Sequence, residues 1–295
     1  MKRCLVITLM LLFPHLTFAA EKITVLLDWF LNPSHAPLFV AEQQGFFKKQ
    51  NLDVTLISPA ESSDPPKLIA AGQGDIGIDY QPQYLQQINR GMPLAVIGEL
   101  IDKPLNCMAV LDNSGIRDIK DLRGKTIGHS TGELNGVMLK TMLNKEGLSL
   151  KDVNSINLHF DLVQALLTHK VDAVTGLSRN LEPIQIAMHK QAVRVFYPES
   201  NGIPTYAELI FVVNKDKVND PRWKPFLAAV KQGQEYLQAH PKEMWDAFVL
   251  TYPELNNELN KRAWFVSLPY FAKDPEKIDQ KKWDAFAAFM KKNQL

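Results

Sequence analysis

The stretch 23–47 constrains the fold of this chain more than any other. It opens with an almost continuous apolar run over 23–27, turns polar and aromatic at Asp28 and Trp29, and resumes as a helix pattern after the break at 32–34. Such an apolar run is typical of a strand covered on both faces, as in a parallel α/β sheet. Ligands of open α/β sheets bind beyond the carboxyl ends of the strands, which is where this pattern places the polar and aromatic pair.

The alternation of strand and helix patterns continues along most of the chain. Up to Leu100 the order is βαβαβαβ, the signature of a mostly parallel sheet with helices on both faces. We interpret 105–111 as the crossing into a second α/β lobe and 208–214 as the return to the first. Amphipathic helices that pack on the first lobe are expected after Asp220, at 221–239, 241–250, 254–266 and 275–292.

A short internal sequence similarity favours two related lobes over one large sheet. The segments 68–77 and 165–174 both have the pattern helix, tight turn, Asp, strand, with Asp75 and Asp172 at the same position. We therefore expect an α/β fold of two lobes joined by two crossover segments, with a ligand cleft between them. The first lobe is predicted at 20–108 and 207–295, and the second at 109–206.

The first 19 residues have the pattern of a secretory signal peptide. A basic Lys2-Arg3 pair precedes a short apolar core at 4–13, and the small residues Thr17 and Ala19 stand at the cleavage positions. The apolar core is about half of the roughly 20 residues that a membrane span needs. We expect cleavage after Ala19 and export of a soluble protein.

Charge and cysteine content exclude several classes of protein. Removal of Lys2 and Arg3 takes the net charge from +1 to −1, which favours neither nucleic acid nor an acidic membrane as a partner. Cys107 is then the one remaining thiol, so an intramolecular disulfide is impossible. The seven histidines are scattered, and no metal-binding, nucleophile-elbow or phosphate-loop motif is present. No cofactor and no metal are expected.

Three aromatic or acidic residues at strand ends are candidate ligand contacts in the first lobe. The indole of Trp29 could stack on a flat heteroaromatic ring while Asp28 accepts hydrogen bonds from amino groups. Alternatively, Trp29 packs at the end of the lobe and Asp28 caps the turn. The residues alone leave both interpretations open. Tyr80 follows another strand end in the same cleft, although ordinary loop packing suits it better. His35 fits a helix start better than a ligand contact.

Two further segments offer polar groups to the cleft. A helix start in the second lobe presents hydroxyl and backbone N–H groups that could bind an anion or another acceptor, or simply cap the helix, at Ser130, Thr131, Gly132 and Glu133. Near the return crossover, Tyr206 could close over a ring, and the Glu208 carboxylate could accept from an amino group.

Several short blocks of the sequence form a recognisable set: LDW at 27–29, NPSHAP at 32–37, GFF at 45–47, LDV at 52–54, GDIG at 74–77, DLRGK at 121–125, GE at 132–133, and PTY and EL at 204–206 and 208–209. In these blocks, which cover most of the mature chain, the sequence resembles the family that contains the periplasmic substrate-binding proteins for thiamine pyrimidine precursors and the eukaryotic hydroxymethylpyrimidine synthases. The first block is specific to the family. DLRGK is shared with sulfonate- and nitrate-binding proteins.

The resemblance implies a type II periplasmic-binding fold and the role of a receptor for an ABC importer. Its partners would be the permease and ATPase subunits, its location the periplasm, and its state a monomer. The implied ligand is formylaminopyrimidine or hydroxymethylpyrimidine. We assign Trp29 and Tyr206 to ring stacking, Asp28 and Glu208 to the ring's amino and nitrogen groups, and 130–133 to the exocyclic substituent.

Two other functions remain to be weighed. A sulfonate or riboflavin-like solute would keep the fold, but an anion needs a basic cleft, and Arg179 is the one arginine placed near a strand end there. A synthase-like enzyme would need the lysine and histidine that the resemblance implies for synthases. Those positions hold Asp79 and Gln83 here, and no cysteine-rich run lies near 206–211. We therefore expect no enzyme activity.

Overall fold

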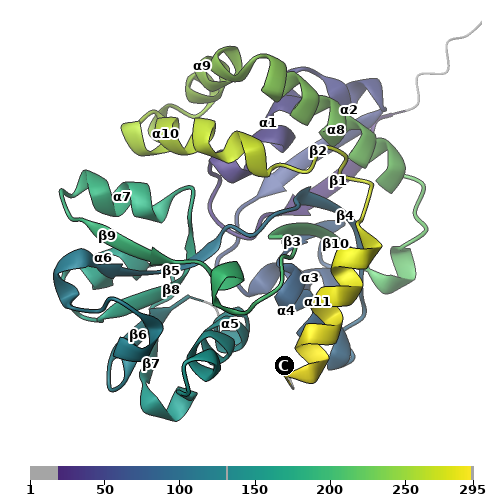
Figure 1. Cartoon of the computed structure of the whole chain (residues 1–295). Helices are drawn as coiled ribbons and strands as arrows, with labels where there is room; N and C mark the ends of the chain where they lie inside the picture. Colours follow the sequence, from purple (N-terminus) through teal and green to yellow (C-terminus); the bar gives the residue numbers. More distant parts are fainter. Residues whose placement is uncertain (1–18, 131, 294–295) are drawn as a thin grey trace, which may run out of the picture.

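The chain folds into two α/β lobes that lie side by side (Figure 1). The computed structural model describes residues 19–130 and 132–293, so the expected signal peptide lies outside the described residues except for Ala19. One sheet has the strand order β2-β1-β3-β10-β4 and the other β7-β6-β8-β5-β9. The expected α/β fold of two lobes joined by two crossovers is confirmed.

The first sheet is parallel on one side and antiparallel on the other. Strand β1 pairs in parallel with β2 and β3, and β10 lies antiparallel between β3 and β4. The chain therefore returns to this sheet late in the sequence, as predicted. The strands are β1 (Glu21–Leu26), β2 (Leu52–Ile57), β3 (Ile76–Asp79), β4 (Leu94–Ile101) and β10 (Leu209–Asn214), and the helices are α1 (Ala36–Gln43), α2 (Phe46–Lys49), α3 (Asp64–Ala70) and α4 (Gln81–Asn89).

The second lobe repeats this arrangement. Its strands are β5 (Asn106–Leu111), β6 (Thr126–His129), β7 (Asn154–Asn157), β8 (Ala173–Ser178) and β9 (Val193–Phe196), and its helices are α5 (Gly132–Lys145), α6 (Leu162–Leu167) and α7 (Glu182–Met188). Strand β5 pairs along its length with β8 and β9. The predicted boundary between 108 and 109 therefore falls inside β5, and the first crossing lies earlier, between Ile101 and Asn106. The return crossing lies between Phe196 and Leu209.

Three of the four C-terminal helices cover the first lobe, as expected. Helices α8 (Trp223–Ala239), α9 (Pro241–Thr251) and α10 (Glu258–Ser267) contribute Phe226, Phe248 and Trp264 to the core of this lobe. Helix α8 packs closely on α1, because a Cβ at Gly233 would lie 2.4 Å from the carbonyl oxygen of Pro37. Short 3-10 helices complete the chain at Pro33–His35, Asp112–Ser114, Ile119–Leu122, Leu150–Asp152, Pro198–Asn201, Lys215–Lys217, Pro253–Leu255 and Leu268–Tyr270.

The last helix, α11 (Gln280–Lys292), departs from the expectation. Its Trp283 packs on Tyr84 of the first lobe, with ring centroids 6.0 Å apart. Its Phe286 and Met290 belong to the core of the second lobe. Helix α11 therefore contacts both lobes, and in Figure 1 it is the yellow helix that ends beside α5. Among the described residues, no helix has the length and apolar character to span a bilayer.

Candidate functional site

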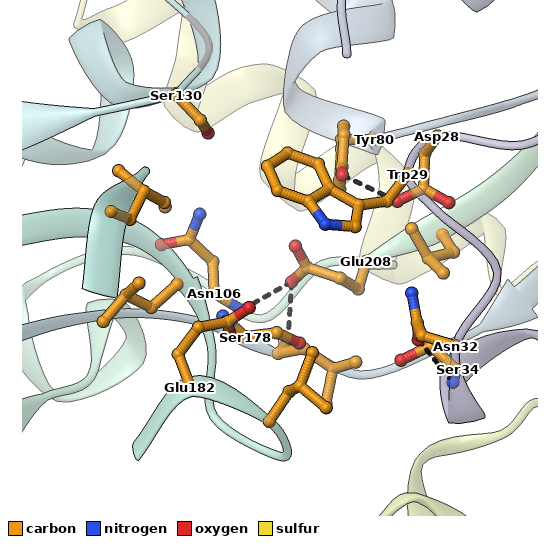
Figure 2. Close-up of a pocket in the computed structure, with 16 residues that line it drawn as sticks. Asp28, Trp29, Asn32, Ser34, Tyr80, Asn106, Ser130, Ser178, Glu182 and Glu208 are labelled. Atoms are coloured by element: carbon orange, nitrogen blue, oxygen red, sulfur yellow. Dashed lines mark hydrogen bonds between the residues drawn. The ribbon is translucent and has the colours of Figure 1, made fainter. Parts of the chain in front are cut away.

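A cavity lies between the lobes, at the carboxyl ends of β1, β3 and β8 (Figure 2). The volume within which the centre of a water molecule can move is about 70 Å³. A site for one water needs about 10–15 Å³ by the same measure, so this cavity holds several waters or a single small ring. It is lined by Asp28, Trp29, Asn32, Ser34, Tyr80, Leu105, Asn106, Ser130, Leu162, Gly176, Leu177, Ser178, Leu181, Glu182, Glu208 and Leu209.

Asp28 is held in place by two side-chain donors. The Tyr80 hydroxyl donates to Oδ2 at 2.7 Å, and His35 Nε2 lies 3.0 Å from Oδ1. The backbone N–H of Asn32 donates to His35 Nδ1 at 3.2 Å, so Nε2 carries the ring proton and donates to Asp28. Burial and the nearby Asp28 charge raise the pKa of Tyr80 well above its usual value, which keeps the hydroxyl protonated. His35 thus supports Asp28, in line with the interpretation that it is not a ligand contact.

The Trp29 indole forms one wall of the cavity (Figure 2). Its outer edge meets Phe160 of the second lobe, with ring centroids 4.4 Å apart and planes at 73°. This edge-to-face contact joins the two lobes beside the cavity, as expected for aromatic pairs. Trp29 therefore both lines the cavity and contacts the second lobe.

Glu208 lies at the return crossover with its carboxylate buried. Its Oε2 accepts the backbone N–H groups of Leu105 and Asn106 at 2.6 and 2.9 Å. Burial raises the pKa of Glu208 to about 7, although these hydrogen bonds and the Arg179 charge act in the opposite direction. Figure 2 shows the other carboxylate oxygen directed into the cavity below the Trp29 indole. Near neutral pH this group can therefore either accept or donate a hydrogen bond.

Glu182 is a second acid of the cavity, half-buried rather than fully buried, and it was not among the residues predicted from the sequence. Its Oε2 accepts the backbone N–H of Ser178 at 2.6 Å, and burial raises its pKa to about 7. It is the first residue of α7, four positions past the end of β8, whereas Asp28 lies in the loop directly after β1. The strand-end rule that singled out Asp28 therefore did not reach Glu182.

No basic side chain faces the cavity among the described residues that line it. Arg179 is occupied elsewhere: its Nη1 and Nη2 donate to Glu199 at 2.6 and 2.8 Å, and Nη2 also donates to the carbonyl of Asn106 at 3.1 Å. Three carboxyl groups line the cavity, from Asp28, Glu182 and Glu208. Such a lining favours ligands that bring N–H donors or positive charge over anions.

The structure brings together some of the predicted contacts and separates others. Asp28, Trp29, Tyr80, Ser130 and Glu208 all line the cavity. Tyr206 is fully buried, packs on Phe286 at 5.1 Å between ring centroids, and does not line the cavity. A position inside the core does not suit stacking on a ligand, so we assign Tyr206 a structural role.

The remaining predicted contacts belong to the helix start of the second lobe. Thr131 lies outside the described residues. Gly132 and Glu133 form the first turn of α5.

Comparison with known families agrees with this architecture. The model of the family described as "NMT1/THI5 like" matches residues 32–244. The chain belongs to this family. A Haemophilus influenzae relative named for thiamine biosynthesis is 46% identical over 98% of this chain and 92% of its own length. A second relative, the 4-amino-5-hydroxymethyl-2-methylpyrimidine phosphate synthase of Uromyces fabae, is 28% identical over 87% of this chain and 78% of its own length.

The fold is shared with periplasmic binding proteins. An alkanesulfonate-binding protein from Xanthomonas axonopodis superposes with a TM-score of 0.72 at 16% identity, covering 94% of this chain and 95% of that one. At this identity the likeness defines the fold alone. The NMT1/THI5-like chain therefore has the two-lobed fold of periplasmic binding proteins, one relative named for thiamine biosynthesis and another named as a pyrimidine phosphate synthase.

Proposed function

We propose that this protein is the periplasmic solute receptor of an ABC importer and binds an aminopyrimidine precursor of thiamine, formylaminopyrimidine or hydroxymethylpyrimidine. The observation that carries the proposal is the lining of the cavity, which combines an indole face with three carboxyl groups and no base among its described residues. An aminopyrimidine offers a flat ring for the indole and amino hydrogens for the carboxylates.

Sequence and relatives support the same cargo and location. The N-terminal pattern of a signal peptide fits an exported receptor. One relative is named for thiamine biosynthesis, and the other is named for a reaction on a 4-amino-5-hydroxymethyl-2-methylpyrimidine. The receptor would deliver its cargo to a permease and an ATPase, with closure of the lobes burying the ring.

A sulfonate cargo, the alternative within this fold, is disfavoured by charge. A sulfonate needs N–H donors or a cation, and Arg179 is already paired with Glu199. The three carboxyl groups would repel it. A riboflavin-like solute, with three fused rings, exceeds the single small ring that the cavity suits.

A synthase activity is disfavoured by the residues near Tyr80. The positions that the family resemblance gives to the synthase lysine and histidine hold Asp79 and Gln83, which are hydrogen-bonded to each other at 2.8 Å. No lysine lines the cavity in the described part of the chain. The site does not fit pyridoxal phosphate bound as a Schiff base, so we propose a receptor without a cofactor.

Calorimetry on protein that has been unfolded and refolded, to strip any carried ligand, tests the proposal. Both pyrimidines are titrated, and an alkylsulfonate serves as the control. We expect micromolar or tighter binding of at least one pyrimidine and none of the sulfonate. Failure of both pyrimidines to bind at micromolar concentration would refute the cargo, and a sulfonate heat would favour the alternative. Native mass spectrometry of the protein before stripping identifies any other ligand.

A further inference from the structure

Asn106 lines the cavity and has no role in the fold that accounts for its side chain. It is the first residue of β5, where the chain enters the second lobe. Its backbone is fixed from two sides, because its N–H donates to Glu208 Oε2 at 2.9 Å and its carbonyl accepts from Arg179 Nη2 at 3.1 Å. The backbone of Asn106 is therefore held in place by both of its polar groups.

The carboxamide itself is buried and lacks a partner. Asn106 is 3% exposed, and its Oδ1 has no hydrogen bond to any described residue. Figure 2 shows the amide directed into the cavity, on the side where Ser130 lies. A buried acceptor without a partner costs folding free energy, so a polar residue here is explained if a bound molecule supplies the partner.

Among the described residues lining the cavity, Asn106 is also the one whose side-chain amide has no committed hydrogen-bond partner. The other lining carboxamide, Asn32, is committed at both atoms, with Oδ1 accepting from the Ser34 N–H at 2.8 Å and Nδ2 donating to the Phe30 carbonyl at 2.8 Å. Each of the three lining carboxyl groups has at least one oxygen committed to the protein: Glu208 Oε2 accepts two backbone N–H groups, Glu182 Oε2 accepts one, and both oxygens of Asp28 have side-chain donors. A ring nitrogen next to an amino-bearing carbon needs a donor and an acceptor side by side, and the Asn106 carboxamide is the lining group with both of its polar atoms uncommitted among the described residues.

We propose that Asn106 determines specificity by pairing bidentately with the amino group and the adjacent ring nitrogen of the bound pyrimidine. Asparagine reads adenine through the same combination of an amino group and a neighbouring ring nitrogen. The Oδ1 atom accepts from the amino group and Nδ2 donates to the nitrogen. This inference rests on the proposed aminopyrimidine cargo, and it adds a contact that the strand patterns of the sequence do not indicate.

A double-mutant cycle tests the pairing. Wild-type protein and Asn106→Leu are each titrated with 4-amino-5-hydroxymethyl-2-methylpyrimidine and with its analogue in which C–H replaces the ring nitrogen beside the amino-bearing carbon. We expect the wild type to prefer the pyrimidine roughly 10- to 100-fold. Asn106→Leu should bind both ligands with similar, weak affinity. Full discrimination by Asn106→Leu, or losses that simply add, would overturn the inference while leaving the cargo intact.

Two controls separate recognition from folding. The ligand-free Asn106→Leu protein should melt no lower than the wild type, because leucine removes an unpaired buried polar group. Asn106→Asp keeps the size and the acceptor but cannot donate once ionised, and it should lose most of the preference for the ring nitrogen. Retention of that preference by a folded Asn106→Asp protein would also overturn the inference. If the wild type binds formylaminopyrimidine but not hydroxymethylpyrimidine, the cycle is run with formylaminopyrimidine and its C–H analogue, and if it binds neither pyrimidine, the proposed cargo fails and the pairing fails with it.

Discussion

The two lobes are built alike but face the cavity differently. In the first, Asp75 Oδ2 accepts the backbone N–H of Thr24 at 2.9 Å, and in the second, Asp172 Oδ2 accepts that of Thr126 at 2.8 Å. Each bond ties the turn before a central strand to its parallel neighbour, which gives the internal sequence similarity a physical basis. Both sheets also receive one antiparallel strand from a crossover.

The difference appears where the lobes meet the cavity. On the first lobe, both oxygens of Asp28 are satisfied by the protein itself. On the other side of the site, at the two crossovers and in the second lobe, Asn106 Oδ1 has no partner among the described residues, and burial raises the pKa values of Glu208 and Glu182 to about 7. The polar groups of the first wall, on the first lobe, are thus already paired. The polar groups of the second wall, on the other side, are buried at a cost in folding free energy, which a ligand with N–H groups would lower by pairing with them. The same division would let the first lobe hold the ring before the second closes on it.

The largest expected effect concerns the pH dependence of the ligand-free protein. The folded-state pKa of Glu208, about 7, lies above its ordinary value of 4.5, so the folded state binds more protons between these pH values. Stability should therefore fall as pH rises from about 4.5 to 7, by on the order of 3 kcal/mol for this residue. Urea unfolding at pH 5 and pH 8 measures it.

The variants Glu208→Gln and Glu182→Gln should each flatten that pH dependence and raise stability at pH 8. In Glu208→Gln, the new side chain would still accept from the two backbone N–H groups through its amide oxygen. The control is Glu42→Gln, at an exposed glutamate of α1, which should leave the slope unchanged. A wild-type free energy of unfolding that is constant from pH 5 to 8 would contradict the view that burying these ionised carboxyl groups destabilises the ligand-free protein.

The next largest effect is the loss of stacking on the first wall. Trp29→Ala should weaken pyrimidine binding by about 1–3 kcal/mol, the range for a base stacked on an aromatic side chain. Phe30→Ala is the matched control, because Phe30 also packs on Phe160, at 4.7 Å, but does not line the cavity. Equal losses in both variants, measured by calorimetry, would mean that Trp29 acts through lobe contact alone.

A smaller effect is expected where the lobes are joined by hydrogen bonds. Asn180 of the second lobe is fully buried, and its Nδ2 donates to Ser267 Oγ at 2.6 Å and to Ser34 Oγ at 3.2 Å in the first lobe. Asn180→Ala should weaken ligand binding by about 1 kcal/mol, because closure then loses these bonds. Small-angle scattering of the liganded protein should show a larger radius of gyration than for the wild type. An unchanged affinity and radius would show that closure does not depend on Asn180.

Features of this molecule that depend on local sequence were predicted well from the sequence, and features that depend on contacts between distant segments were not. Helices set by local patterns and proline starts were placed closely: the predicted 241–250 is α9 at Pro241–Thr251, and 275–292 contains α11 at Gln280–Lys292. The position of α11 across both lobes was missed, because Trp283 and Phe286 lie on one amphipathic helix whose pattern does not say which core each residue enters.

The site was predicted as far as the strand-end rule was applied. That rule found Asp28, Trp29 and Tyr80, which line the cavity. It missed Glu182, which begins the helix after β8 instead of lying at the strand end. Asn106 lies at the start of a strand rather than its end, so it faces the cavity only because the chain crosses between lobes there. Tyr206 was misplaced for the opposite reason: its aromatic character fits a ligand contact and a core residue equally well, and packing against Phe286 decides between them.

The smallest effect should come from the exposed ion pair at the edge of the cleft. His159 Nδ1 lies 3.2 Å from Glu61 Oε2 across the two lobes, and both side chains are more than half exposed. Exposed pairs contribute little and are screened by salt, so Glu61→Ala should change ligand affinity by about 0.5 kcal/mol or less. Calorimetry at pH 6 and pH 8, at low and high salt, measures it. An effect as large as that of Asn180→Ala would mean that surface charge, rather than the buried contacts of the two walls, controls closure.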